Sequence, residues 1–194
     1  MFAGLVVLTR GNEEVTTAEP SQHVFGEGGK KVTLIEYGDF QCPACYQYEP
    51  VMQEIREKYK DKINFQFRNF PLAQIHPNAL ADHSAAEAAS KQGKFWEYHD
   101  VLYEQQKAWS TAASSSRSAT FEGYAAELGL NIEQFKSDME NSDVRAVIDA
   151  DIEEGESIGA TGTPTFVLNG KKLEKTSANV DAFSKLIDEE LKKL

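Results

Sequence analysis

The sequence predicts an α/β fold whose core is interrupted by an inserted all-helical domain. A β-branched and aromatic run over 32–37 precedes a helical pattern over 43–59, and a strictly alternating run over 63–67 follows it. Helical patterns then fill residues 76–159, and a hairpin and a closing helix complete the chain. We therefore expect residues 30–75 and 160–194 to form one core around the inserted residues 76–159.

The N-terminal residues 1–29 are expected to be a tether. Residues 2–8 are apolar, but this stretch is far shorter than the roughly 20 residues that span a bilayer. Two interpretations stay open: a frayed apolar terminus, or the outer end of a signal or membrane anchor upstream of residue 10. Residues 11–29 are polar and contain Pro20 and several glycines, which is typical of a linker.

The core begins with a strand, a helix and a second strand. The helix over 43–59 is predicted by apolar and aromatic side chains at helical spacing, namely Tyr48, Val51, Met52, Ile55 and Tyr59. Two strands joined by a crossover helix form a βαβ unit with parallel strands. After the insertion, residues 165–168 and 171–173 flank Asn169-Gly170, the preferred two-residue hairpin turn. An amphipathic helix over 180–191 closes the chain.

The inserted domain is predicted to be built of helices only. Residues 79–89 are rich in alanine, which favours helix, and an apolar stripe over 144–158 predicts a longer helix that ends at Gly159. The serine-rich residues 110–120 are expected to form a loop, followed by a short helix that ends at Gly129. The histidines of this domain show no paired spacing and are expected at the surface or at helix caps; they are His76, His83 and His99.

Composition excludes several classes of function. The chain has 194 residues, of which 41% are hydrophobic and 26% charged, as in an ordinary globular protein. Its net charge of −11 argues against a nucleic-acid partner, because phosphate binding needs clustered lysine and arginine.

The two cysteines of the chain, Cys42 and Cys45, lie together at the start of the first helix. Pro43 falls at the first helical position, where its missing N–H group costs nothing. The positive end of the helix favours the thiolate of Cys42, the nucleophilic form, and Cys45 is placed one turn on to resolve a mixed disulfide. A structural disulfide explains the pair poorly because its loop is so short. A structural zinc site would need four cysteine or histidine ligands, so we expect no metal.

The chain resembles the DsbA-like branch of the thioredoxin superfamily from about residue 31 to its end. The motifs that carry the resemblance are residues 36–45 with Cys-Pro-Ala-Cys, Arg-Asn-Phe-Pro-Leu at 68–72, His-Pro-Asn-Ala at 76–79, Gly-Lys-Phe-Trp-Glu-Tyr-His at 93–99 and Gly-Thr-Pro-Thr-Phe at 162–166. The resemblance implies a thioredoxin-like core with an inserted helical domain. It also implies an extracytoplasmic thiol–disulfide oxidoreductase, either free or membrane-anchored, that acts on thiol-containing protein substrates. A membrane quinone-linked redox partner would reoxidise it, and its redox group is the cysteine pair itself, without a metal, nucleotide or flavin.

The resemblance also assigns roles to residues around the cysteines. Glu36 is expected to lie beneath the pair, where a partly buried carboxylate takes the proton that Cys45 loses. The bond between Thr163 and Pro164 is expected to be cis, with the backbone of Thr163 free to pair with a substrate peptide. Together with Pro43 and Ala44, these two residues form the expected substrate contacts.

Ala44 departs from the most oxidising relatives, which carry histidine between the proline and the second cysteine. Alanine gives the thiolate no hydrogen bond and no positive charge, so the disulfide is expected to be less oxidising here. Dithiol oxidation is the expected direction of exchange. Two alternatives stay open: a disulfide reductase or isomerase of the same fold, and a peptide-binding chaperone-like module.

Overall fold

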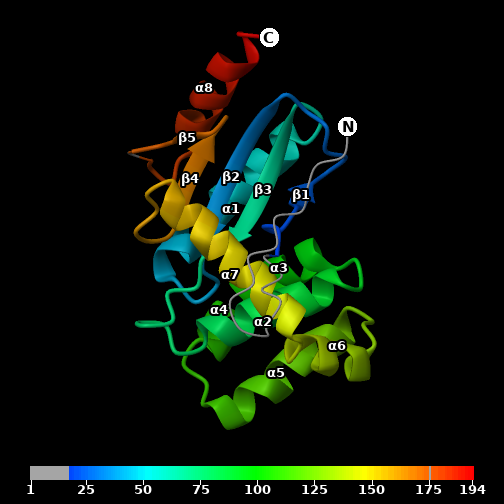
Figure 1. The fold of residues 1–194 in the computed structure, drawn as a ribbon. Helices are drawn as coiled ribbons and strands as arrows, with labels where there is room; N and C mark the ends of the chain where they lie inside the picture. The colour runs from blue at the N-terminus through cyan, green and yellow to red at the C-terminus, as the bar shows by residue number, and fades with distance from the viewer. Residues whose placement is uncertain (1–17, 175) are drawn as a thin grey trace, which may run out of the picture.

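A five-stranded sheet forms the core of the molecule, with strand order β1-β3-β2-β4-β5. The computed structural model describes residues 18–174 and 176–194 (Figure 1). The strands are β1 (His23–Phe25), β2 (Val32–Gly38), β3 (Ile63–Asn69), β4 (Thr165–Leu168) and β5 (Lys171–Lys172). Helix α1 (Pro43–Tyr59) joins β2 to β3, which run parallel, so the predicted βαβ unit is present. The fold class predicted from the sequence is confirmed.

The register of the sheet places the end of β2 beside the start of β4. In β2, Tyr37 pairs with Thr165 at the start of the antiparallel strand β4. The residues that follow β2 and the residues that precede β4 are therefore neighbours in space. The β4–β5 hairpin turns through Asn169 (φ 50°) and Gly170 (φ 76°), and positive values at both positions are those of the predicted turn.

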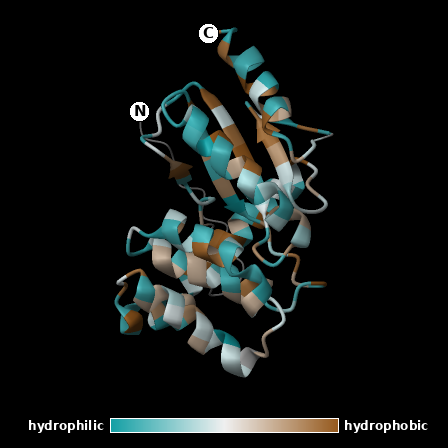
Figure 2. Cartoon of the chain, turned by 180° about the vertical axis from the view of Figure 1, so that it is seen from behind, coloured by the Kyte–Doolittle hydropathy of each residue, from teal (hydrophilic) through white to brown (hydrophobic). Residues whose placement is uncertain are grey.

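Helices cover both faces of the sheet. On one face, α1 and α8 (Val180–Leu191) pack on an apolar cluster that includes Leu34, Phe65 and Phe166. On the other face, α7 (Ser142–Ser157) crosses the sheet in front of β3, and a smaller cluster includes Tyr37 and Val167 (Figure 1). Seen from behind, the central strands carry long hydrophobic stretches (Figure 2).

The remaining helices gather at the end of the sheet where β2 and β3 finish. They are α2 (Ala79–Ser90), α3 (Phe95–Glu104), α4 (Gln106–Trp109), α5 (Ser114–Glu127) and α6 (Ile132–Met139). Their shared core is built largely of alanine and aromatic side chains, and it includes Phe40, Cys42 and Cys45 from the sheet side. The two cysteines therefore lie at the junction between the sheet and this helical layer.

The predicted tether over residues 1–29 is wrong for its last part. His23–Phe25 form β1, an antiparallel edge strand in which His23 pairs with Phe67 of β3. The preceding Ser21 is buried, and its N–H and hydroxyl groups donate to the two carboxylate oxygens of Asp151 in α7, at 2.8 and 2.7 Å. A strand of this length leaves little periodicity to detect, and its partners are distant in the sequence. Residues 1–17, with the apolar stretch discussed as an anchor, lie outside the described residues.

Two expectations for the helical layer are also corrected. A loop was expected over 110–120, but helix α5 begins at Ser114. The reason is the packing of Phe121, which is fully buried and lies edge-on to Trp109 with the ring centroids 5.5 Å apart. Tertiary packing overrides the weak helix propensity of serine here. His83 and His99 were expected at the surface or at caps, but both are fully buried. Burial lowers the pKa of each to about 4, so both are neutral at physiological pH.

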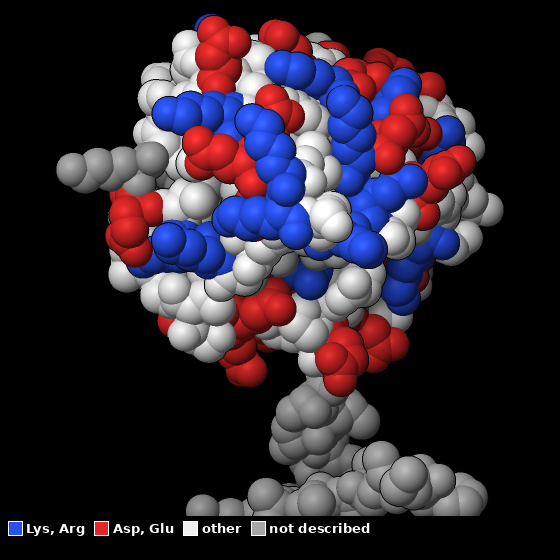
Figure 3. Space-filling view, turned by 90° about the horizontal axis from the view of Figure 1, so that it is seen from above, with Lys and Arg blue, Asp and Glu red and all other residues white. Residues whose placement is uncertain are grey.

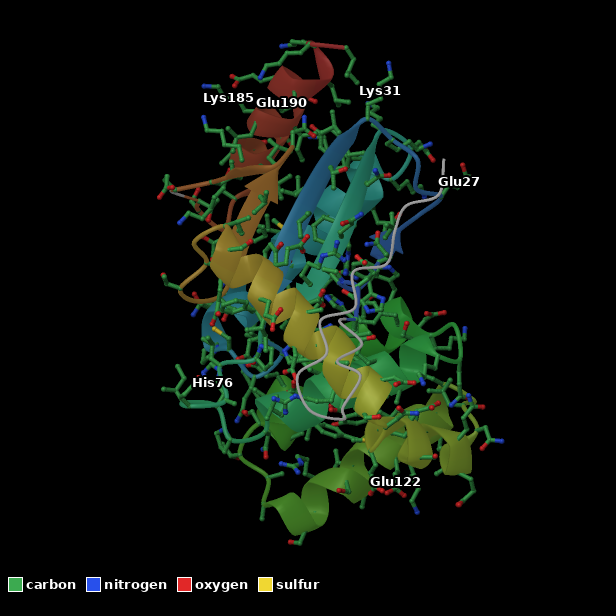
Figure 4. All side chains as sticks on the ribbon, viewed as in Figure 1. Glu27, Lys31, His76, Glu122, Lys185 and Glu190 are labelled. Atoms are coloured by element: carbon green, nitrogen blue, oxygen red, sulfur yellow. The ribbon has the colours of Figure 1, made fainter. Side chains whose placement is uncertain are left out.

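The far end of the molecule, which carries the C-terminus, has a surface of mixed charge. Figure 3 shows lysine and arginine side chains gathered there with acidic side chains among and around them. Lys60 lies 3.2 Å from Glu57, and Lys193 is paired with Glu190. Lys31 and Glu190 mark this end in Figure 4, whereas His76 lies at the other end, beside the helical layer. Within the described ranges 18–174 and 176–194, every helix is too short or too polar to cross a bilayer.

Candidate active site

Cys42 occupies the N-cap of α1, and Cys45 lies in the first turn of the same helix. The turn that delivers them is closed by a hydrogen bond from the Cys42 N–H group to the Asp39 carbonyl, at 3.0 Å. Pro43 takes the first helical position, as the sequence predicts. Both thiols are free, but their exposure differs: Cys42 is 6% exposed and Cys45 is completely buried. A reacting sulfur can therefore reach Cys42 far more easily than Cys45.

The surroundings of Cys42 stabilise its thiolate. A hydrogen bond with the Cys45 thiol is the main cause that lowers the pKa of Cys42 to about 5, against the opposing effect of burial. The side chain of Thr163 and the backbone N–H groups of Cys45 and Ala44 lower this pKa further. In the thiol form, the Cys42 sulfur lies 3.5 Å from the Thr163 carbonyl oxygen, to which it donates. Among the described residues, the Thr163 hydroxyl has no hydrogen-bond partner, so it can donate to the sulfur once Cys42 ionises.

Cys45 has the opposite environment. Complete burial raises the pKa of the Cys45 thiol well above its ordinary value, and the neighbouring Cys42 and Glu36 raise it further. Burial also raises the pKa of Glu36 to about 8, with a further increase from the nearby carboxylate of Glu49. Glu36 is only 1% exposed, and its Oε2 atom has no hydrogen-bond partner in the part of the chain that the structure describes. A carboxyl group of this kind can exchange a proton near neutral pH.

Thr163 and Pro164 reach the cysteines because β4 pairs with β2. Tyr37, near the end of β2, lies opposite Thr165, which directly follows Pro164. The peptide bond between Thr163 and Pro164 is cis in the structure. Of the other expected substrate contacts, Pro43 is exposed and Ala44 is half-buried. The structure therefore gathers all the predicted site residues around the N-terminus of α1.

Sequence reasoning missed Asp39, which builds the turn before Cys42. Its buried carboxylate accepts hydrogen bonds from the N–H groups of Gln41 and Leu72, each at 2.8 Å. The Nδ1 atom of His76 lies 2.8 Å from the same carboxylate. The first of these bonds is an Asx turn, and an aspartate two residues before Gln41 was its signal in the sequence. The bonds to Leu72 and His76 link segments that no local pattern connects.

Two clusters of acidic and histidine side chains have their oxygen and nitrogen atoms close enough together to resemble metal sites. Among the described residues, the first joins Asp39, Asp82 and His83, and the second is made up of Glu49, His99 and Asp100. Neither contains a cysteine. In the second cluster, the buried guanidinium of Arg56 already binds Glu49 and Asp100 at 2.8 Å each. The carboxylates of Glu49 and Asp100 are therefore already neutralised by Arg56, which disfavours a metal ion at this position.

Comparison with known proteins adds a family and a set of similar folds. Residues 18–189 match the family model described as Thioredoxin. The Na(+)/H(+) antiporter NhaA 1 of Salinispora arenicola is 36% identical over 162 residues, which are 84% of this chain and 24% of that protein. The Na(+)/H(+) antiporter NhaA of Herminiimonas arsenicoxydans is 32% identical over 78% of this chain and 23% of its own length. The chain thus spans about a quarter of the length of these curated relatives.

Solved structures share the arrangement of sheet and helices. Oxidised BdbD from Bacillus subtilis has a TM-score of 0.76 at 23% identity, over 91% of this chain and 97% of that chain. For α-DsbA1 from Wolbachia pipientis, the TM-score is 0.75 at 20% identity, over 93% and 96% of the two chains. A thioredoxin-like oxidoreductase from Silicibacter pomeroyi gives 0.72 at 24% identity, over 87% and 91%. At these identities, the comparison establishes a shared fold.

Proposed function

The chain belongs to the thioredoxin family, and on this premise we propose that it is a DsbA-like thiol–disulfide oxidoreductase that oxidises dithiols in protein substrates. The observation that carries the proposal is the asymmetry of the cysteine pair. Cys42 is 6% exposed and its pKa is lowered to about 5, whereas Cys45 is completely buried and its pKa is raised by burial. A pair of this kind has one sulfur for attack by substrate and one for resolution.

The reaction begins with the oxidised pair. A substrate thiolate attacks the sulfur of Cys42, the Cys42–Cys45 bond breaks, and Cys45 leaves as a thiolate that takes a proton from Glu36. A second substrate thiolate then attacks the substrate sulfur of the mixed disulfide, and Cys42 leaves. Two electrons pass to the cysteine pair and the substrate gains a disulfide. The low pKa of Cys42 makes it a good leaving group, which favours substrate oxidation.

The reverse direction uses the same residues. When reduced Cys42 attacks a disulfide, the Cys45 thiol must lose its proton before it can release the partner. Glu36 lies close enough to Cys45 to raise the pKa of the Cys45 thiol. The pKa of Glu36 itself is about 8. We assign the transfer of this proton to Glu36 in both directions.

Substrate contacts are proposed for the surface around Cys42. The backbone of Thr163 lies beside the reacting sulfur and would pair with an extended substrate segment, flanked by Pro164 on one side. Exposed Pro43 and half-buried Ala44 form the other side. Contact through the main chain selects for an accessible cysteine rather than for one sequence, which suits unfolded protein substrates.

We place the protein outside the cytoplasm, where disulfides persist, with a membrane quinone-linked enzyme as the reoxidant of the cysteine pair. The relatives named as Na(+)/H(+) antiporters contain a similar segment within a larger protein. This likeness supports the proposal that the present chain acts at a membrane surface. The cysteine pair serves as the redox group, and no metal, nucleotide or flavin enters the reaction.

A refolding assay tests the proposal. The oxidised protein should restore activity to a reduced, unfolded ribonuclease, and Cys42→Ser should abolish this while Cys45→Ser accumulates mixed disulfides. Failure of the wild type to transfer its disulfide would refute the proposal. If the double variant Cys42→Ser/Cys45→Ser kept full refolding activity, a chaperone-like binding module would be the better description. A reduction potential near that of thioredoxin, about −270 mV, would favour a reductase or isomerase.

A further inference from the structure

Helix α4 of the helical layer contacts the cysteine turn through one buried side chain. Gln106, the first residue of α4, is 5% exposed. Its Nε2 atom donates to the carbonyl oxygen of Phe40 at 2.8 Å and to that of Cys42 at 3.0 Å. Both carbonyl groups belong to the turn that leads into α1. One amide group from a distant part of the sequence therefore holds two peptide units next to the reacting sulfur.

The Cys42 carbonyl also begins the hydrogen-bond ladder of α1, because it accepts from the Tyr46 N–H group at 3.1 Å. Its orientation thus fixes the first turn of the helix. The N–H groups of Ala44 and Cys45 lie in that turn, and their hydrogen bonds to the Cys42 sulfur help to lower the pKa of Cys42. Hydrogen bonds weaken steeply as they lose alignment, so a small rotation of the turn would reduce this stabilisation.

The amide of Gln106 is itself held in place. Asn78, at the start of α2, donates through Nδ2 to the carbonyl groups of Trp109 and Ser110 at 3.3 and 3.2 Å. The indole of Trp109 is fully buried and donates to the Leu102 carbonyl at 2.8 Å. The Gln41 side chain connects the two segments, because it donates to the Ser110 carbonyl and accepts from the Asn78 N–H group. This framework gives Gln106 one fixed position relative to Cys42.

We propose that Gln106 is a positioning residue of the redox site, which holds the carbonyl groups of Phe40 and Cys42 and so directs the first-turn N–H groups of α1 at the Cys42 sulfur. The inference rests on the proposed function and extends it, since the helical layer then helps to set the reactivity of the nucleophile. Both hydrogen bonds that Gln106 donates to this turn go to backbone carbonyl groups, so it acts through Cys42 rather than on a substrate.

The test is a titration of the reduced protein, followed by the absorbance of the thiolate near 240 nm. Gln106→Met keeps the length of the side chain but removes the donor. Its Cys42 midpoint should rise by roughly 0.5 to 1 pH unit, as expected when the hydrogen bonds to the thiolate are weakened but not lost. Alkylation of Cys42 at a pH near the wild-type midpoint should slow by about two- to five-fold. The neighbouring Gln105 is exposed, so Gln105→Met is a matched control that should leave the midpoint unchanged.

An unchanged midpoint in folded Gln106→Met, or an equal rise in Gln105→Met, would overturn the proposal. Circular dichroism of the oxidised form reports whether each variant is folded. If Gln106→Met does not fold, Gln106→Asn takes its place, because the shorter amide cannot reach both carbonyl groups and should give the same upward shift. The titration needs no substrate. Failure of the proposed oxidase activity would therefore appear in the refolding assay, whereas failure of this inference would appear only in the titration.

Discussion

The stability of the reduced protein relative to the oxidised protein should increase as the pH rises from about 5 to 8. The cause is the Cys42 thiolate, whose pKa is lowered to about 5 in the folded reduced state. The free value is about 8.5 in the unfolded chain. A group whose folded pKa is depressed adds stability that is complete above the unfolded pKa and is lost as the pH falls through the folded pKa.

The size of the effect follows from the two pKa values. Each pH unit between them changes the free energy of unfolding by at most about 1.4 kcal/mol. Two units separate the folded pKa from pH 7, which gives an upper limit of about 2.7 kcal/mol. The Cys42 sulfur is near the surface, so solvent screens part of this stabilisation. We therefore expect the ionisation of Cys42 to add on the order of 2 kcal/mol to the free energy of unfolding at pH 7.

Denaturant unfolding of the reduced and oxidised proteins at several pH values measures this quantity. The difference in unfolding free energy between the two forms should grow with pH, because the oxidised form has no thiol to ionise. Glu36 is present in both forms, so its own titration largely cancels in the difference. The series should stay below about pH 8.5, because the pKa of buried Cys45 is raised and this thiol begins to oppose folding as the unfolded chain ionises.

The variant Cys42→Ser is the control. The difference in unfolding free energy between reduced Cys42→Ser and the oxidised wild type should not grow with pH, because serine does not ionise in this range. If the difference between the reduced and oxidised wild type stayed flat from about pH 5 to 8, the assignment of a stabilised thiolate to Cys42 would be wrong.

Three further predictions concern single side chains. Ala44→His should lower the pKa of Cys42 further and raise the reduction potential, because an imidazole adds a donor and a positive charge; thiolate absorbance and glutathione equilibration measure both. Glu36→Gln should slow the release of partners by Cys45 about 100-fold and remove the inflection near pH 8, as measured by stopped-flow kinetics of mixed disulfides. Asp151→Ala should destabilise the protein by about 3 kcal/mol in urea unfolding, because several buried donors would lose their partner.

Each prediction has an outcome that contradicts it. An Ala44→His variant with the wild-type reduction potential would remove the role given to Ala44. A Glu36→Gln variant that keeps the wild-type pH profile would show that another group takes the proton. For the third, Asp149→Ala in the same helix serves as the control, since the Asp149 side chain is 46% exposed and pairs with Arg145 at the surface. Equal losses for Asp149→Ala and Asp151→Ala would refute the role of the buried network.

Local patterns in the sequence predicted the core and the redox pair. The strand before Cys42, the proline that follows it and the apolar face of the next helix are all visible within about 30 residues. The Asn169-Gly170 turn was predictable for the same reason, because the turn type requires positive φ at both positions. The main cause of the depressed pKa of Cys42 is also local, since it is a hydrogen bond with the thiol of Cys45 in the same helical turn, whereas the contribution of Thr163 comes from a distant segment.

Residues whose roles depend on distant partners could not be predicted. Asp151 looks like one of many acids on α7, yet it accepts from Ser21 and Asn69, which belong to separate segments. Gln106 and Gln105 are chemically identical neighbours, and only the packing of α4 decides which one turns toward Cys42. Chemistry at these positions is fixed by tertiary structure rather than by spacing.

The attachment of the N-terminal segment has a mechanical consequence. Ser21 is hydrogen-bonded to Asp151 of α7. His23 is hydrogen-bonded to the Glu87 side chain of α2 at 2.7 Å, and its backbone pairs with β3. A force applied through preceding residues would load these contacts first, and β1 would have to shear along β3 before the load reached the turn around Cys42. Molecules coupled to a solid support through their N-terminus should therefore retain their redox chemistry under flow, whereas coupling through the exposed residues beside Cys42 should impair it.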